Sequence, residues 1–369
     1  MTTLNGPRAG STKLRDVAQR ARVSTASVSR FVNNPATVSQ ELRTRIESAI
    51  SELAYVPHWA ARSLASKRSH TIGAVVPTLK LAIFGAGIEA LQERLHESSY
   101  TLLFASCQYD LTREVELVRS IVNRRVDGIV LVGHQHEEPI YQMMNNARIP
   151  FVNTYAYDPD SPYPCIGFDN YKAAHRMARH LLDIGHRRFG VITSTLRNND
   201  RISARLQGIL AALSDADIEP DLIMEVEYAI EGGRRALREL LSRHPDITAV
   251  PCTTDAHGIG AILEAAQMGI GVPAQLSVTG FDDLDLARQV SPSLTTVHVP
   301  ADELGHRAAE YILAAIDEKA RSPKIELSVD LVLRESHAPP RRRSRIRAAS
   351  SEPAGGTRRF AAATCDITD

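Results

Sequence analysis

The first sixty residues carry apolar side chains at helical spacing in three separate stretches. Each stretch has one apolar stripe with the i, i+3, i+4 repeat: Leu14, Val17, Ala18 and Ala21; Val28, Phe31 and Val32; Ile46, Ala49, Ile50 and Leu53. Ser24 and Ser39 stand where helix N-caps belong, and the run 33–35 (Asn-Asn-Pro) ends the second stretch. Only residues 22–24 separate the first two helices, which is typical of a helix-turn-helix.

The period of the pattern changes after residue 70. Short apolar runs, rich in β-branched residues, alternate with helical stretches of ten or more residues: IGAVV (72–76), TLLFA (101–105), GIVLV (128–132), FGVIT (189–193), ITAVPC (247–252) and LSVTG (276–280). This alternation predicts an α/β fold whose parallel sheets are covered on both faces. The stretch is too long for one core, so we expect two doubly wound lobes with a ligand cleft at the carboxyl ends of their strands.

The charge is zero overall but unevenly distributed. Residues 1–70 carry +7, residues 71–337 carry −11 and residues 338–369 carry +4. A basic head on an acidic body indicates a polyanion-binding module. The Arg-rich end, which also holds Pro, Gly and Ser, is expected to be a disordered basic tail.

Several protein classes are not expected. No run of about 20 apolar residues is present, as a bilayer span would need, and no signal peptide stands at the N-terminus, so we expect a cytoplasmic protein without membrane contact. Cys107, Cys165, Cys252 and Cys365 form no Cys-x-x-Cys pair and predict neither a disulfide framework nor a zinc site.

Taken together, these motifs resemble the LacI/GalR family of bacterial repressors. The resemblance runs from about Thr12 to Pro340. It rests on the helical head, on AARSL (60–64), on IGFDNYKAAHRMARHLLDIGHRRFGVIT (166–193), on the stretch 272–300 with its GFDD (280–283), and on LVLRESHAPP (331–340). It implies a three-helix head followed by a two-lobed effector domain like a periplasmic binding protein.

The resemblance also implies domain boundaries. We predict a disordered N-terminus (1–11), a DNA-binding head (12–57), a hinge helix (58–70), a first effector subdomain (71–169 with 300–322), a second (170–299 with 323–337) and the tail (338–369).

The second helix, at about residues 25–33, is the recognition helix that the resemblance implies, and it would lie in the major groove of double-stranded DNA. Thr25, Ala26 and Arg30 match base-reading positions, and Arg30 has the donor geometry for guanine. The alternatives are an exposed first turn without base contacts for Thr25 and Ala26, and a phosphate contact for Arg30. Ser24, Ser27, Ser29 and Asn33 are expected to bind phosphates or to cap the helix.

The hinge resembles the family segment that becomes helical on the operator. Leu64 matches a leucine that wedges between central base pairs from the minor groove, and Ala60 and Ala61 are small enough for two hinge helices to approach. An ordinary linker leucine is the alternative. Paired hinges imply a homodimer and a pseudo-palindromic operator, and a higher oligomer stays open.

The effector cleft is predicted from matched positions. Phe84 would line the pocket, Tyr228 would stack on the ligand, and Arg205 and Asp282 would bind its polar groups. Asp200, Arg201 and Asp255 complete the set of predicted effector-binding residues. The alternatives are a core phenylalanine, an exposed arginine and a helix-capping Asp282. The family often has Asn-Asp where Thr254-Asp255 stands here, so an amide contact is missing. We expect a carbohydrate or sugar-acid inducer, with a purine-like co-repressor as the alternative.

An enzyme and a transport receptor are the rival classes. The stretch around Gly258 and Gly260 lacks a full dinucleotide-binding motif, and neither a GxSxG, a P-loop nor an HExxH sequence occurs. His134 and His136 could provide at most half of the ligands of a metal site. We prefer to interpret this segment as a polar loop at the cleft. A transport receptor must be exported and does not require a DNA-binding head, whereas this sequence shows such a head and no signal peptide. We therefore predict no enzyme activity, no cofactor and no metal.

Overall fold

The computed structural model describes residues 12–33, 37–55, 68–80, 82–319 and 322–340. Its first part is a bundle of three helices, α1 (Leu14–Ala21), α2 (Thr25–Asn33) and α3 (Gln40–Glu52). All three predicted stripes contribute to its core: Val17, Ala18, Ala21, Val28, Phe31, Ile46, Ala49 and Tyr55 are buried there. The turn after α1 is made by Arg22, whose φ of 53° is left-handed and ends the helix. The hinge residues Ala61 and Leu64 lie outside the described residues.

A six-stranded parallel sheet forms the first lobe, in the order β11-β5-β4-β3-β1-β2. Its strands are β1 (Thr71–Val76), β2 (Thr101–Ser106), β3 (Gly128–Val132), β4 (Phe151–Thr154), β5 (Cys165–Gly167) and β11 (Lys324–Glu326). One hydrophobic core lies under α5 (Ala82–Glu97) and α13 (Ala301–Ile316), and a second lies under α6 (Leu111–Asn123) and α7 (Glu138–Asn146). Both faces of the sheet are therefore covered, as the continuous apolar runs predicted.

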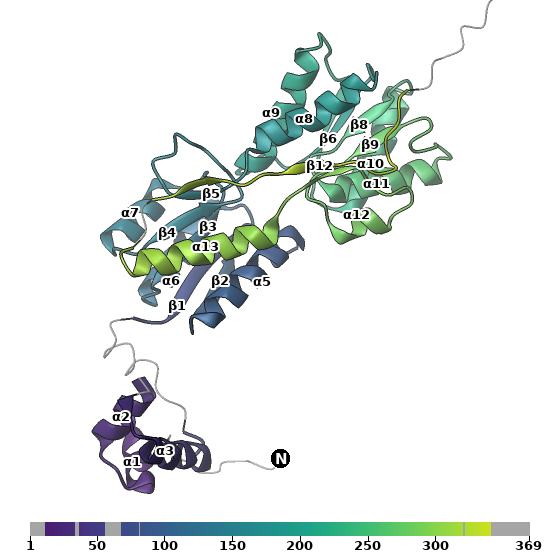
Figure 1. Cartoon of the computed structure of the whole chain (residues 1–369). Coiled ribbons are helices and arrows are strands. Elements are labelled where there is room, and N and C mark those ends of the chain that lie inside the picture. Colours follow the sequence, from purple (N-terminus) through teal and green to yellow (C-terminus); the bar gives the residue numbers. More distant parts are fainter. Residues whose placement is uncertain (1–11, 34–36, 56–67, 81, 320–321, 341–369) are drawn as a thin grey trace, which may run out of the picture.

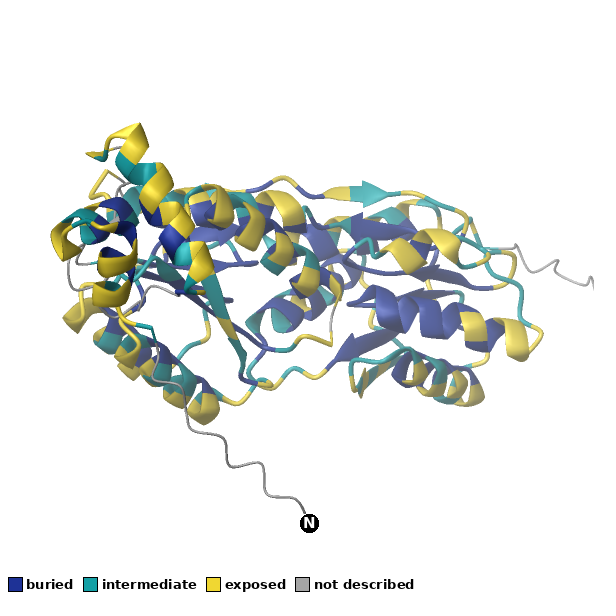
Figure 2. Cartoon of the chain, turned by 90° about the horizontal axis from the view of Figure 1, so that it is seen from below, coloured by how far each residue is buried: buried dark blue, intermediate teal, exposed yellow. Residues whose placement is uncertain are grey.

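The second lobe repeats this plan with shorter strands. These are β6 (Gly190–Ser194), β7 (Leu222–Val226), β8 (Ala249–Pro251) and β9 (Ser277–Thr279), which pair in parallel as β6 with β7 and β8 with β9. Single bridges from Phe189 to Ala249 and from Ile192 to Cys252 join the two pairs. The covering helices are α8 (Asn170–Asp183), α9 (Asp200–Ser214), α10 (Ile230–Arg243), α11 (Asp255–Gln267) and the short α12 (Asp285–Gln289). Figure 2 shows the buried strands enclosed by helices whose outer faces are exposed.

The chain passes between the lobes three times. It crosses after β5, again after β10 (Thr296–His298), and a third time between β11 and β12 (Asp330–Val332), which pairs antiparallel with β10 (Figure 1). We predicted that residues 323–337 belong wholly to the second lobe, and this is wrong for the first of them. The edge strand β11 pairs with β5 of the first sheet, and only the residues after it reach the second lobe.

Within the described part of the chain, no helix combines the length and apolar character that a membrane crossing requires.

Candidate functional site

The exposed face of α2 carries the side chains predicted to read DNA. Thr25, Ala26 and Arg30 are exposed, whereas Val28 and Phe31 on the opposite face are buried. Ala26 and Arg30 are four residues apart and therefore share one face of the helix. The structure thus presents these three side chains to a partner outside the head.

The predicted capping role of Ser24 is visible in the geometry. The backbone N–H of Ser27 donates to Ser24 Oγ at 3.1 Å, and the two hydroxyls are 2.9 Å apart. Asn33 ends α2. The sequence analysis overlooked Arg45 on α3, whose Nη2 donates to the carbonyls of Ala21 (2.7 Å) and Arg22 (3.0 Å). This contact fixes the turn that sets α2 against α1.

A second site lies where the two lobes meet. Side chains from both lobes enclose a cavity of about 30 Å³, which is large enough to hold a water molecule. It is lined by Ile83, Phe84, Tyr109 and Tyr155 of the first lobe and by Asn199, Arg201, Ile202, Arg205, Tyr228, Thr254 and Asp282 of the second. Of the seven residues predicted to bind an effector, Phe84, Arg201, Arg205, Tyr228 and Asp282 line it.

A wider opening adjoins this cavity. About 720 Å³ of space lies between residues 108–112 of the first lobe and residues 194, 195, 197–199, 227 and 228 of the second. Tyr109, Asn199 and Tyr228 line both spaces and therefore stand between them. The outer space has the size of a typical small-molecule cleft.

Arg205 is the centre of a buried polar network in the second lobe. Its Nη1 donates to Asp282 Oδ1 at 2.9 Å and to the Thr253 carbonyl at 3.0 Å, and its Nε donates to Asn170 Oδ1 at 2.9 Å. The guanidinium also lies 3.7 Å from the centroid of the Phe281 ring. Burial raises the pKa of Asp282, and the adjacent Arg205 partly offsets that rise. A paired charge held in this way is preorganised for hydrogen bonding to a ligand.

Asn170 is a contact residue between the lobes that the sequence analysis missed. It is buried on the first turn of α8, and its Nδ2 donates to the Tyr155 carbonyl of the first lobe at 2.9 Å. Through Asn170 the orientation of Arg205 depends on the position of the first lobe. The signal in the sequence was its place shortly after β5, at the start of the next helix, where the chain crosses between lobes.

Asp200 and Arg201 make direct contact across the lobes. Asp200 Oδ2 accepts from the backbone N–H of His134 at 2.6 Å, and Arg201 Nη1 donates to the Val132 carbonyl at 3.1 Å and to Asp200 Oδ1 at 2.8 Å. We call this contact, between the backbone of residues 132–134 and the pair Asp200 and Arg201, the clasp. Burial alone would raise the pKa of Asp200, but Arg201 and the His134 N–H bring it below its ordinary value.

The clasp needs a glycine at position 133. Gly133 has a φ of +94°, and a Cβ there would lie 2.0 Å from Arg201 Nη1. Only a residue without a side chain allows the guanidinium to approach the backbone of the first lobe this closely.

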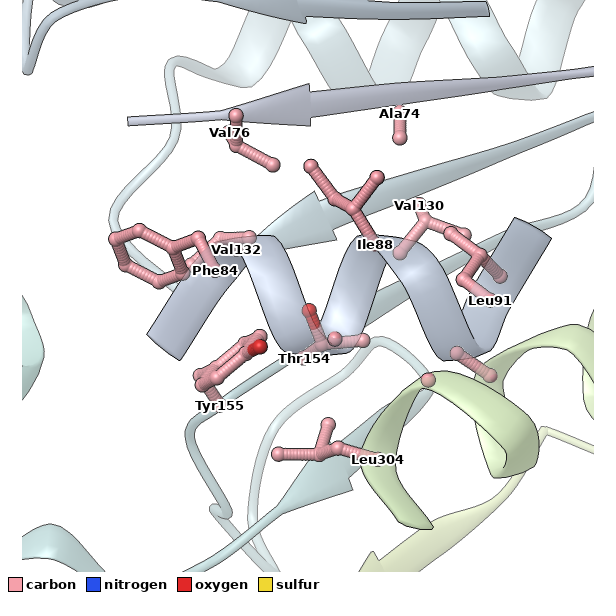
Figure 3. Close-up of a pocket in the computed structure, with 13 residues that line it drawn as sticks. Ala74, Val76, Phe84, Ile88, Leu91, Val130, Val132, Thr154, Tyr155 and Leu304 are labelled. Atoms are coloured by element: carbon pink, nitrogen blue, oxygen red, sulfur yellow. The ribbon is translucent and has the colours of Figure 1, made fainter. Parts of the chain in front are cut away.

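Aromatic rings form the apolar wall of the cavity. Phe84 and Tyr155 meet edge to face with centroids 5.1 Å apart, at one end of an apolar layer between α5, α13 and the sheet (Figure 3). Phe84 therefore belongs both to the core and to the cavity wall. The predicted pocket-lining position and the alternative of a core phenylalanine both describe it. Tyr228 contributes a buried hydroxyl for which the described residues provide no hydrogen-bond partner. Burial raises the pKa of Tyr228, which keeps this hydroxyl neutral.

Asp255 does not line the cavity, although we predicted it among the effector-binding residues. Its Oδ2 accepts from the Leu284 N–H at 2.7 Å, and its Oδ1 accepts from the Thr296 hydroxyl. Both oxygens are thus used to fasten the GFDD loop and β10, and the preceding Thr254 faces the cavity instead. Burial, reinforced by the nearby Asp282, raises the pKa of Asp255 to about 7.

Other missed residues are Tyr109 and Asn199. Tyr109 lies in a left-handed turn with a φ of 59°, and its carbonyl accepts from Asn198 Nδ2 at 2.9 Å. Asn199 caps α9 by accepting from the Ile202 N–H. Turn residues of this kind carry no periodic signal, so hydrophobic patterning does not reveal them. In the described part of the chain, no three His, Cys, Asp or Glu side chains gather as a metal site would require.

Known protein families match both the head and the two-lobed part of the chain. Residues 13–58 match the model of the bacterial regulatory proteins of the lacI family, and residues 178–337 match a periplasmic binding protein-like domain. The HTH-type transcriptional repressor PurR of Escherichia coli O139:H28 is 33% identical over 330 residues, which are 88% of this chain and 96% of that protein.

Solved structures share the whole arrangement. A LacI-family transcriptional regulator from Silicibacter pomeroyi has a TM-score of 0.82 at 25% identity and covers 89% of this chain and 100% of its own. The complex of the transcriptional regulator CelR with cellobiose has a TM-score of 0.64 at 28% identity and covers 88% of this chain and 99% of its own. The chain belongs to the lacI family of bacterial transcriptional regulators, with a DNA-binding helix-turn-helix ahead of a two-lobed domain like that of periplasmic binding proteins.

Proposed function

We propose that the protein represses transcription as a homodimer on a pseudo-palindromic operator, and that a small polar molecule between the lobes controls operator affinity. One observation supports the ligand site above others. The buried ion pair of Arg205 with Asp282 shares a cavity with the Tyr228 hydroxyl, which finds no hydrogen-bond partner among the described residues, and both lobes line that cavity. Buried polar groups of this kind are costly unless a partner completes their hydrogen bonds.

DNA recognition is assigned to α2 and the hinge. Arg30 would donate to guanine, Thr25 and Ala26 would contact neighbouring bases, and Leu64 would wedge between base pairs in the minor groove. The exposed Arg30 and the buried Val28 behind it support this orientation of α2. The relatives are named as transcriptional regulators, which supports a role without catalysis.

The ligand would act through the lobe orientation. A molecule changes an equilibrium only by binding one arrangement better than the other. Asn170, Asp200 and Arg201 all bind across the lobes, so a ligand that displaces or strengthens these contacts would alter the positions of the two hinges. An inducer would favour the arrangement that separates the hinges, and a co-repressor the one that pairs them.

The chemistry of the cavity wall suits a carbohydrate or a sugar acid best, and the lobes would have to separate to admit one, because the cavity holds only about 30 Å³. Arg205 and Asp282 provide a donor and an acceptor for neighbouring hydroxyls, Arg201 suits a carboxylate, and Tyr228 provides a ring and a hydroxyl. The similarity to a regulator solved with cellobiose supports a sugar. A planar purine-like co-repressor is the second candidate, favoured by four aromatic rings (Phe84, Tyr109, Tyr155 and Tyr228) around the cavity.

Thermal-shift screening of the full chain against sugars, sugar acids and nucleobases tests the ligand site. A ligand at 100 times its Kd stabilises the folded state by about 2.7 kcal/mol, which is measurable as a rise in Tm. The rise should be absent in the double variant Arg205→Ala with Asp282→Ala. A ligand that stabilises wild type and double variant equally would place the site elsewhere.

Footprinting on sites selected from random DNA tests the operator side. Two half-sites related by dyad symmetry are expected, since a two-fold protein reads a two-fold site. Selected sites without dyad symmetry would contradict the paired arrangement.

A further inference from the structure

The chain enters the first lobe through a turn at residues 68–70, the last three residues of the predicted hinge. Asp127, in the loop between α6 and β3, binds this turn with both carboxylate oxygens. Its Oδ1 accepts from the N–H (2.9 Å) and the hydroxyl (3.0 Å) of Ser69, and its Oδ2 accepts from the His70 N–H at 2.8 Å. The Asp127 N–H in turn donates to the Thr71 carbonyl at 2.8 Å. Asp127 therefore fixes the backbone at the point where the hinge meets β1.

His70 gives this turn its direction. Its φ of 50° is left-handed, which is uncommon for a residue with a side chain. Its carbonyl accepts from the Thr101 N–H of β2 at 2.9 Å, and its ring lies against that of Tyr100, with centroids 5.0 Å apart. A backbone conformation of this kind persists where surrounding contacts determine it. The first lobe thus sets the direction in which the chain leaves β1 for the hinge.

Arg68 makes a second contact, two residues before His70. Its Nη2 donates to Asp317 Oδ1 at 2.8 Å and to the Ile316 carbonyl at 3.3 Å, at the end of α13. A cation is favoured there because helix C-termini carry partial negative charge. The turn is therefore held by two separate parts of the first lobe, the loop 124–127 and α13.

We propose that Asp127, Arg68 and Asp317 are positioning residues for operator binding, because they hold the exit of the hinge in one direction. We call the turn 68–70, together with Asp127 and Asp317, the anchor. The inference rests on the proposed function, in which two hinges pair on the operator. Hinges that leave their lobes in a fixed direction lose less conformational freedom when they pair. One released backbone residue costs roughly tenfold in affinity, because it must be ordered again on DNA.

Charge alone predicts the opposite result for the two carboxylates. DNA is a polyanion, so removal of a carboxylate close to the hinge should strengthen operator binding if Asp127 and Asp317 act only through their charge. Loss of the anchor should weaken operator binding instead. The sign of the change in Kd therefore separates a positioning role from an electrostatic one.

Asp127→Asn tests the larger of the two contacts. The variant keeps the size of the side chain, but one of its acceptors becomes an amide that faces a backbone N–H. Operator affinity should fall about tenfold, the effect of releasing one residue. The slope of log Kd against log salt should stay as in wild type, since no phosphate contact is lost. Fluorescence anisotropy of the full chain on the selected operator, at several salt concentrations, measures both. Thermal melts check that the variant is folded at the assay temperature. Unchanged or tighter binding would overturn the proposal.

Asp317→Asn is the second variant, because its partly exposed position keeps the fold insensitive to the change. Operator affinity should fall about two- to fivefold, as for the loss of one exposed ion pair. In an Arg68→Gln background the same change should add no further loss, because the two side chains act as a unit. Tighter binding from Asp317→Asn in both backgrounds would mean that Arg68 contacts phosphate instead, and would contradict the anchor.

The matched control is Asp183→Asn, which breaks the exposed ion pair of Asp183 with Arg179 on the second lobe. This pair holds no part of the turn 68–70, so the operator Kd should stay as in wild type. A loss as large as that of Asp317→Asn would overturn the proposal, because it would not be specific to the hinge. Wild type that binds no operator of dyad symmetry would contradict the proposed function. Wild type that binds one, with anchor variants that bind it equally well, would contradict the anchor alone.

Discussion

The head and the cleft hold the side chains proposed to act there in opposite ways. In the head, Thr25, Ala26 and Arg30 are exposed on a helix whose other face is fixed by a small core. In the cleft, Arg201, Arg205 and Asp282 are buried and already bonded to other groups of the protein. The head can receive a partner without rearrangement, whereas a ligand in the cleft must replace contacts that the protein makes with itself.

This difference explains how one site can control the other. Exchanging internal contacts for ligand contacts changes the balance between lobe arrangements, which is the requirement for coupling between distant sites. The exposed Thr25, Ala26 and Arg30 have no such side-chain contacts to exchange among the described residues. The predictions below test this contrast, beginning with the largest effect.

Arg205→Ala should have the largest effect, because it leaves the buried carboxylate of Asp282 without its partner. Loss of one partner from a buried ion pair costs about 3–5 kcal/mol of unfolding free energy. Urea denaturation of the full chain measures it. The exposed pair of Arg179 with Asp183 is the control, and Arg179→Ala should cost at most about 0.5 kcal/mol. Equal losses of unfolding free energy in the two variants would mean that the cleft ion pair behaves like a surface ion pair.

Arg30→Ala should weaken operator binding by about 1–3 kcal/mol and relax the preference for one base pair, without affecting the fold. Fluorescence anisotropy with the selected operator and with single-base variants measures both effects. The control is Arg15→Ala on the exposed face of α1. If Arg30→Ala weakens binding to all sequences alike, Arg30 contacts phosphate.

Asp255→Asn should change how stability depends on pH. The folded pKa of about 7 lies above the ordinary value, so the folded state binds the proton more tightly than the unfolded state. The stabilisation is fully present below about pH 4 and is lost as the pH rises through 7, by up to about 1.4 kcal/mol for each pH unit. The free energy of unfolding, measured between about pH 5 and 7.5, should fall less in the variant than in wild type. Parallel curves would rule out a proton on Asp255.

Tyr228→Phe should have the smallest effect on stability, within about 0.5 kcal/mol, because its hydroxyl has no partner among the described residues. It should nevertheless weaken binding of a thermal-shift ligand by about 0.5–1.5 kcal/mol, as expected for one lost hydrogen bond. Isothermal titration calorimetry measures the affinity. Unchanged affinity would remove the hydroxyl from the site.

Local patterns predicted the parts of the molecule that are built from neighbouring residues. The apolar stripe around Val28 and Phe31 gave α2 with the bounds found in the structure, and the run 128–132 gave β3. The family resemblance identified Arg205 and Asp282 at the cavity. The residues that define α2 and β3 are neighbours in the sequence, and so are the residues of the motifs that contain Arg205 and Asp282.

Contacts between distant residues could not be predicted in this way. Strand β11 belongs to the first lobe because it pairs with β5. Lys324 lies opposite Cys165, which stands some 160 residues earlier in the chain. Asp255 was assigned to the ligand because its bonds to Leu284 and Thr296 have no sequence signature. The pairing of His136 with Glu114 likewise joins a loop to a helix that precedes it.

Operator affinity measured with and without the ligand found by thermal shift tests the central claim most directly. Fluorescence anisotropy of the full chain should show a change of about 5- to 150-fold in the operator Kd of wild type, the usual range of allosteric coupling. Asp282→Asn, which keeps the volume of the side chain but removes its charge, should bind the operator as wild type does and lose most of that change. An operator Kd that the ligand leaves unaltered in wild type, or alters equally in Asp282→Asn, would contradict control through the cleft.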